Sequence, residues 1–111
     1  MARPKIRRTV CCEPSVNYFK PRGIPLTELD RVNLAVDELE ALRLKDLEEM
    51  EQEKAATTMN VSQPTFHRIL QSAHSKVADA LVNGKAIRIE GGEYIVKEGK
   101  RTGKLGGIGG Y

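Results

Sequence analysis

The sequence predicts a mainly α-helical fold that contains a helix-turn-helix, a long third helix, an irregular N-terminal segment and a C-terminal β-hairpin. Residues 52–71 hold two helical stretches separated by a tight turn. Residues 63–81 carry apolar side chains at helical spacing, and residues 86–97 alternate around Gly91-Gly92. With 111 residues, the chain has room for one domain.

We divide the chain into three parts. Residues 1–9 are basic, and we expect them to form a flexible arm. Residues 10–97 form the helix-turn-helix domain with its hairpin, and Tyr18 and Phe19 are expected to attach its irregular first segment to the core. Residues 98–111 are rich in glycine, so we expect a disordered tail.

Three helices are predicted, over residues 36–47, 52–59 and 63–81. The third is followed by the stop signal Asn83-Gly84. A short helical turn is expected within residues 25–34. The side chains expected to face the core from the third helix are Phe66, Ile69, Leu70, Ala73, Val77 and Leu81.

The turn of the helix-turn-helix is predicted at Asn60. This position commonly needs a positive φ, which glycine adopts most easily and asparagine tolerates. Ala55 and Ala56 allow two helices to cross closely, and the oxygen of Ser62 suits a cap at the start of the third helix. The small core of this unit is expected to contain Met59, Val61, Phe66 and Ile69.

The hairpin is predicted from residues 86–90 and 93–97, because Gly91-Gly92 forms a favourable two-residue turn. Its apolar face would pack on the helices. The residues expected to pair across the two strands are Ile89 with Tyr94 and Ile87 with Val96.

Charge is unevenly distributed, although the net charge is only +3. Residues 1–31 hold seven basic and three acidic side chains, residues 32–53 two and eight, and residues 54–111 nine and four. This order indicates one face for an anionic partner and another turned away from it, with an ordinary solvated surface as the alternative. No apolar run approaches the roughly 18 residues that span a membrane, and we expect no secretory signal and a cytoplasmic location.

The solvent face of the third helix carries side chains that suit DNA. Positions three and four apart share a helix face, and Arg68 and Gln71 match guanine and adenine edges in the major groove. An ordinary polar helix face is the alternative, which the preceding turn pattern disfavours. An arginine-rich arm is typical of segments that enter the minor groove. The candidate DNA-contacting residues are Ser62, Gln63, Thr65, His67, Arg68 and Gln71 on the third helix, Lys54 on the second, and Arg3, Lys5, Arg7 and Arg8 in the arm.

The cysteines Cys11 and Cys12 are adjacent, so they do not readily form a disulfide with each other. A tetrahedral metal site needs about four ligands, which two chains would have to supply together. We expect two small buried side chains and no metal or cofactor, with metal or redox sensing as the alternative. No nucleophile, carboxylate pair or phosphate-binding loop is recognisable, so we expect no enzymatic activity.

Several stretches of the chain form a recognisable set. They are residues 10–14 (VCCEP), 17–21 (NYFKP), 23–26 (GIPL), 36–44 (VDELEALRL), 55–56 (AA), 61–62 (VS), 65–66 (TF) and 77–87 (VADALVNGKAI). Together they resemble a prokaryotic family of uncharacterised proteins, domain of unknown function one-three-four. The resemblance covers nearly the whole chain up to the hairpin.

The resemblance implies a DNA-binding transcriptional regulator whose helix-turn-helix is similar to region four of bacterial sigma factors. The chain departs from the family pattern at Asn60 and Glu49, where glycine is usual, and at Gln63, where arginine is common. Asparagine suits the turn. Glu49 leaves the first helix junction undefined, and Gln63 alters any inherited base preference.

We therefore expect sequence-specific binding of double-stranded DNA by a homodimer, because one recognition helix alone carries little specificity. Two alternatives remain open. The first is a sigma-like adaptor whose acidic residues 37–53 meet a protein, with RNA polymerase as the candidate partner. The second is a regulator that responds to metal or redox state through Cys11 and Cys12.

Overall fold

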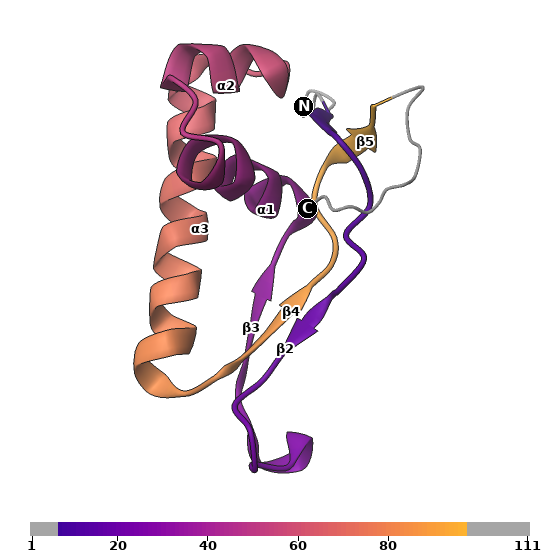
Figure 1. Cartoon of the computed structure of the whole chain (residues 1–111), viewed down its shortest axis with the longest axis vertical. Coiled ribbons are helices and arrows are strands. Elements are labelled where there is room, and N and C mark those ends of the chain that lie inside the picture. The colour runs from indigo at the N-terminus through magenta and orange to yellow at the C-terminus, as the bar shows by residue number, and fades with distance from the viewer. Residues whose placement is uncertain (1–6, 98–111) are drawn as a thin grey trace, which may run out of the picture.

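The computed structural model describes residues 7–97, in which three α-helices lie beside two small β-sheets (Figure 1). Most of the predicted arm, with Arg3 and Lys5, and the predicted tail lie outside the described residues. Helices α1 and α2 cross the upper part of α3 in Figure 1, and the three-stranded sheet runs beside its lower part. Within residues 7–97, no helix combines the length and apolar character that crossing a membrane requires.

The first helical segment consists of α1 (Val36–Leu42) and the π-helical turn η2 (Arg43–Leu47), which together match the predicted helix. A carboxylate oxygen of Glu38 accepts a hydrogen bond from the Ala35 amide at 2.9 Å and so stabilises its start. The chain leaves the helix through Glu49, which has a φ of 58°. A residue with a Cβ is strained in this left-handed conformation. Glu49 is the end of the first helical segment, and no glycine or proline marks this end in the sequence.

Replacing Glu49 by glycine is expected to stabilise the protein by about 0.5–1 kcal/mol. Glycine removes a strain of about 1–2 kcal/mol from the left-handed conformation. Its greater conformational freedom in the unfolded chain lowers stability by up to about 1 kcal/mol. The change is read from the midpoint of urea unfolding. The matched control is Glu53→Gly in the first turn of helix α2, which should lose up to about 1 kcal/mol. Equal losses in both variants would show that Glu49 carries no strain.

The predicted helix-turn-helix consists of α2 (Gln52–Thr58) and α3 (Gln63–Asn83). Asn60 has a φ of 61°, the positive value expected at the turn. The Oγ atom of Ser62 accepts a hydrogen bond from the Thr65 amide at 3.3 Å, which caps α3. Gly84 ends α3 with a φ of 66°, which confirms the predicted stop signal.

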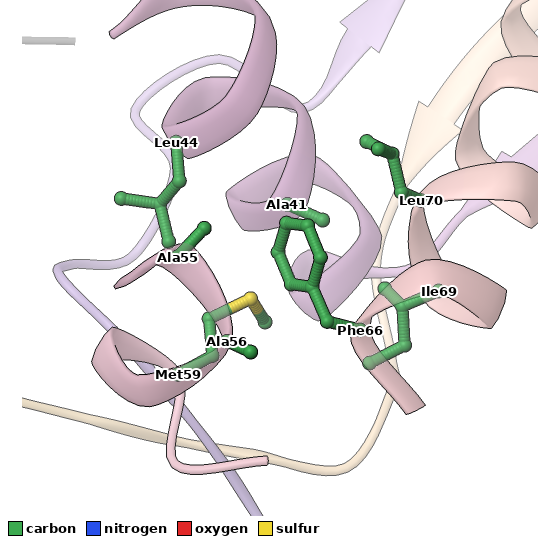
Figure 2. Packing of buried hydrophobic residues seen from close by; sticks show 8 residues of the cluster. All are labelled: Ala41, Leu44, Ala55, Ala56, Met59, Phe66, Ile69 and Leu70. Carbon is green, nitrogen blue, oxygen red and sulfur yellow. The ribbon is translucent and has the colours of Figure 1, made fainter. Parts of the chain in front are cut away.

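The core of this unit lies where α1, α2 and α3 meet (Figure 2). Ala55 and Ala56 are buried on α2, as expected for a close crossing of helices. The ring of Phe66 points from α3 toward α1 and lies next to Ala41 in Figure 2. Val61 is partly buried against the cluster. The buried residues of the cluster are Ala41, Leu44, Ala55, Ala56, Met59, Phe66, Ile69 and Leu70.

A second cluster joins α1 and α3 to the sheets. It contains Val10, Leu34, Val36, Ala73 and Ile89, with Val77 packed against it. Leu81, which the helical spacing places in the core, is 75% exposed, and Ala80 is buried instead. The prediction for Leu81 is wrong because helical spacing indicates a face but not how far along the helix that face is covered.

The predicted C-terminal hairpin is also wrong. Its two strands, β4 (Ala86–Ile89) and β5 (Tyr94–Val96), belong to different sheets. Strand β4 lies between β2 (Tyr18–Phe19), to which it is antiparallel, and β3 (Arg31–Leu34), to which it is parallel. Strand β5 pairs in parallel with β1 (Arg8–Val10). The expected pairs therefore do not form, and Ile87 and Ile89 lie opposite Val32 and Leu34 of β3.

The residues Gly91 and Gly92 redirect the chain instead of closing a hairpin. The Gly91 carbonyl accepts a hydrogen bond from the amide of Val36 at 3.0 Å, at the start of α1. Gly92 has a φ of 103°, and a Cβ there would lie 2.5 Å from Oδ1 of Asp37. These contacts with α1 separate β5 from β4, and β4 takes its parallel partner from an earlier part of the chain.

The N-terminal segment is more regular than predicted. Arg8 and Thr9, which we expected at the end of the flexible arm, belong to β1, and Tyr18-Phe19 form β2. The Phe19 side chain is 53% exposed, so pairing of β2 with β4, and not burial of the ring, attaches this segment. The short helical turn η1 (Leu26–Glu28) is confirmed. Strand β3 was missed, although its exposed and buried residues alternate strictly.

Candidate nucleic-acid interface

The start of α3 is held firmly against α2. Ala55 and Met59 are completely buried beneath it, and the Val61 amide donates a hydrogen bond to the Ala56 carbonyl at 3.0 Å across the turn. The Ser62 cap and Pro64 in the first turn then begin the helix at a defined point. This arrangement sets the direction in which the first turns of α3 leave the domain.

Four of the predicted DNA-contacting side chains lie together in solvent on the first half of α3. They are Gln63, His67, Arg68 and Gln71. Arg68 and Gln71 are three positions apart and His67 and Gln71 four, so these three lie on neighbouring parts of the helix surface. Gln63 precedes the buried Phe66 and Leu70 by three and seven positions, and it is exposed on their side of the helix, in the first turn. All four side chains are exposed, but helical spacing groups only His67, Arg68 and Gln71 on one face, and their contact with DNA stays a prediction.

Arg68 is oriented by hydroxyl groups. Its Nη2 atom donates a hydrogen bond to Oγ1 of Thr65 at 3.3 Å, and the Ser62 hydroxyl donates to the same oxygen at 3.0 Å. Among residues 7–97, Arg68 forms no salt bridge with a carboxylate. Its guanidinium is therefore positioned near the start of α3 and keeps donors available for an anion or a base edge.

The basic residues that are predicted outside α3 and lie within residues 7–97 have different surroundings, and only some of them are exposed. Lys54 is exposed on α2, and Arg7 is exposed just before β1. Arg8 turns toward α1, where its guanidinium lies 3.8 Å from the carboxylate of Asp37. The Thr9 amide donates a hydrogen bond to the Met59 carbonyl at 2.9 Å, a contact that the sequence did not indicate. The N-terminal segment therefore enters the fold beside the turn of the helix-turn-helix.

Glu38 connects α1 to the middle of α3. Its carboxylate accepts hydrogen bonds from Ser72 Oγ at 2.6 Å and from Lys76 Nζ at 2.8 Å, in addition to the Ala35 amide. Burial raises the pKa of Glu38, but the hydrogen bonds from Lys76, Ser72 and the Ala35 amide together outweigh it, so that the pKa lies below its usual value of 4.5. Glu38 therefore fixes the start of α1 against the middle of α3, a contact that the sequence did not indicate.

The acidic stretch predicted as a surface is partly internal. Glu40 is buried and accepts hydrogen bonds from Nε and Nη2 of Arg43, each at 2.9 Å, and from the Cys11 amide at 3.2 Å. Asp37 is buried beside Gly92, and its Oδ1 atom has no hydrogen-bond partner within the described part of the chain. Burial raises the pKa of Asp37 above its usual value, against the opposing charge of Arg8. The acids that remain exposed on this stretch are Asp46, Glu48, Glu49, Glu51 and Glu53.

The cysteines Cys11 and Cys12 are free thiols, each partly buried. Burial, a hydrogen bond with Cys12 and the charge of Glu40 raise the pKa of Cys11 to about 12. This raised pKa disfavours the Cys11 thiolate, which is the form of cysteine that reacts in redox exchange. In residues 7–97, no group of three or more His, Cys, Asp or Glu side chains is arranged to hold a metal ion.

Comparison with known proteins identifies relatives along almost the entire chain. A family described as protein of unknown function DUF134 matches residues 1–97. A UPF0251 protein of Thermoanaerobacter sp. (strain X514) is 59% identical over 106 residues, which cover 96% of this chain and 94% of the relative. A UPF0251 protein of Caldanaerobacter subterraneus subsp. tengcongensis is 64% identical over 96 residues, covering 86% and 81% of the two chains.

A third relative, a UPF0251 protein of Halothermothrix orenii, is 53% identical over 94 residues, covering 85% of this chain and 70% of the relative. No solved structure gives a significant match. The family match includes all three α-helices, both sheets and the N-terminal residues. The chain therefore belongs to the DUF134 family of uncharacterised prokaryotic proteins, the family that its sequence resembles.

Proposed function

We propose that the protein binds double-stranded DNA sequence-specifically, in the cytoplasm, and regulates transcription. The observation that carries this proposal is the first half of α3, where His67, Arg68 and Gln71 are exposed on one side of the helix and Gln63 is exposed in its first turn, directly after the capped start. A helix that follows such a turn commonly inserts its first residues into the major groove. The similarity to sigma region four that the sequence suggests belongs to this proposal.

In this mechanism each group has a distinct task. The guanidinium of Arg68 donates two hydrogen bonds to a guanine, and the amide of Gln63 or Gln71 pairs with an adenine. Ser62 and the amide of Gln63 contact a phosphate at the start of α3, because a helix N-terminus favours negative charge. Lys54 on α2 contacts the backbone on the other side of the turn.

The N-terminal arm extends this contact. The hydrogen bond between Thr9 and Met59 brings β1 beside the turn that precedes α3, and the exposed Arg7 directly precedes β1. We propose that Arg3, Lys5 and Arg7 contact the minor groove or the phosphates beside it. Arg8 is better suited to a structural role, because it pairs with Asp37.

The proposal is tested by selecting random duplex DNA with the purified protein at two salt concentrations. An enriched sequence motif that survives at the higher salt concentration is expected, because base-edge contacts are less sensitive to salt than phosphate contacts. Binding without enrichment that disappears as salt rises would contradict sequence-specific recognition.

Replacing Arg68 by alanine is expected to relax selectivity at one base position and to weaken binding to the selected sequence by about 1–3 kcal/mol. Affinities of the variant for the selected DNA and for single-base substitutions of it measure both effects. The matched control is Arg22→Ala, which removes the same charge from an exposed site in the connection between β2 and β3. An equal loss on every sequence would make Arg68 a phosphate contact and contradict its role in base recognition.

One observation favours a second candidate function, a sigma-like adaptor that binds a protein such as RNA polymerase. Leu47 is 67% exposed at the end of η2, between the exposed acids Asp46 and Glu48. An apolar side chain surrounded by acids suits a partner that presents basic residues around an apolar pocket. Failure of the DNA selection would make this adaptor the preferred function.

A further inference from the structure

The last turns of α3 carry an apolar surface that no other part of residues 7–97 covers. Leu81 and Val82 are 75% and 81% exposed, and Ala78, three and four positions before them, is also exposed. These three residues lie next to one another on the helix surface. We refer to Ala78, Leu81 and Val82 as the α3 C-terminal patch.

The position of the patch in the fold explains why it is uncovered. Figure 1 shows α1 and α2 across the upper part of α3, whereas the lower part runs beside β3 and β4 only. Ala80, on the other side of the helix, is buried. Two large aliphatic side chains thus stand in water on the most regular element of the molecule, where polar residues would ordinarily be found.

We propose that this patch is the surface through which a second copy of the chain binds, with the two α3 helices packed antiparallel about a two-fold axis near Val82. In such an interface the same residues of both copies meet, so the surface must be complementary to itself. The patch satisfies this condition because its three members are uncharged and include the small Ala78, which permits close approach of two helices.

The charges that border the patch also favour a second copy over another partner. The ammonium of Lys85 lies 2.9 Å from the carboxylate of Asp79, the residue that follows Ala78, so one acid and one base lie together beside the apolar residues. Two copies related by a two-fold axis bring the Asp79–Lys85 pair of each into the neighbourhood of the other. The acid of one copy can then face the base of the partner. Two copies that met through a face with charges of one sign would instead repel each other.

The spacing along α3 agrees with DNA recognition by a dimer, and this agreement rests on the proposed function. Arg68 and Val82 are fourteen positions apart, which at about 1.5 Å per residue is about 21 Å. Two α3 helices joined near Val82 would therefore place their Arg68 residues about 42 Å apart. Tilting the helices relative to each other shortens this distance to the separation of DNA half-sites, which is about 34–36 Å. The pairing of the two copies itself does not depend on DNA.

The size of the patch predicts a weak dimer. Stable interfaces bury about 1,200–2,000 Å² in total, which is more than three side chains from each copy provide. We therefore expect monomers at low micromolar concentration and dimers as the concentration approaches the millimolar range. Sedimentation velocity of the full chain without DNA measures this equilibrium directly, and a wild-type chain that remains monomeric throughout overturns the proposal and leaves the patch to a different partner.

The first variant is Val82→Glu, which is expected to remain folded because the side chain is exposed, and to remain monomeric at every concentration. Circular dichroism checks the fold. The matched control is Val16→Glu, at an exposed valine in the loop between β1 and β2, which should dimerise like the wild type. Unchanged dimerisation of Val82→Glu, or an equal loss in both variants, overturns the proposal.

A second experiment tests the two-fold arrangement through charge. Asp79→Lys leaves two bases beside the patch, and Lys85→Asp leaves two acids, so each variant alone should repel itself and stay monomeric. A mixture of the two should dimerise, because the bases of one chain meet the acids of the other. If mixing produces no dimer beyond the level of the separate variants, Asp79 and Lys85 do not meet across an interface and the proposed arrangement is wrong.

Discussion

Replacement of Phe66 by alanine is expected to lower the free energy of unfolding by about 3–5 kcal/mol. The ring is completely buried between α1, α2 and α3, and Figure 2 shows it in the centre of the cluster that they form. Removing the ring reduces the buried apolar surface and leaves a cavity. The three helices cannot fill this cavity by moving toward one another. Since small domains have a total stability of about 5–15 kcal/mol, the variant should be marginally stable.

Urea unfolding of wild type and variant measures this loss. The matched control is Phe19→Ala, which deletes the same ring from a side chain on β2 that is largely exposed, and its cost should stay near 1 kcal/mol or below, as is typical of surface positions. Similar losses at the two positions would mean that the packing of α3 against α1 and α2 differs from the structure described above.

Replacement of Glu38 by alanine is expected to cost about 3 kcal/mol, because hydrogen bonds to a charged group contribute about 1.5–3 kcal/mol each and Lys76 remains partly solvated. The variant leaves the Ala35 amide and the Ser72 hydroxyl without their partner, in addition to the Lys76 ammonium. Glu53→Ala, at an exposed carboxylate in the first turn of α2, is the matched control and should change stability by less than about 0.5 kcal/mol.

The cost of the Glu38 substitution should depend on pH. The pKa of Glu38 is lower in the folded protein than its usual value of 4.5, so the ionised carboxylate stabilises the fold above that value and loses this effect as the pH falls through the folded pKa. The difference between wild type and Glu38→Ala should therefore be largest at neutral pH and shrink below about pH 4.5.

Asp37 acts in the opposite direction. Burial raises its pKa, so its contribution is present at low pH and lost as the pH rises through the folded pKa. Comparing the Glu38 variant with the wild type at each pH cancels this contribution. A constant difference across the acidic range would show that Glu38 stabilises the fold through packing and not through its charge.

The local part of the fold was predictable from the sequence. The turn at Asn60, the cap at Ser62 and the stop at Gly84 depend on backbone preferences within a few residues, and all three are present in the structure. The shared exposed side of His67, Arg68 and Gln71 follows from helical spacing by the same argument. The candidate site on α3 could therefore be located before its surroundings were known.

The pairing of the strands could not be predicted in this way. Gly91-Gly92 is a favourable hairpin signal, but β4 takes Arg31–Leu34 as its parallel partner, from a part of the chain more than fifty positions earlier. The choice depends on which strands the helices bring alongside β4, and no short segment contains that information. The roles of Glu38 and Arg8 were missed for the same reason, because their partners Lys76 and Asp37 lie on other elements.

The sequence alone therefore determined the presence and order of the three helices, the turn at Asn60 with the cap at Ser62, and the stop at Gly84, because each depends on interactions between near neighbours in the chain. Only the tertiary structure decided how the strands pair, which acids are buried, and that Leu81 and Val82 are left uncovered. These features depend on where distant segments meet. An amphipathic pattern states which side of a helix can be buried, but the extent of burial is set by the elements that reach it.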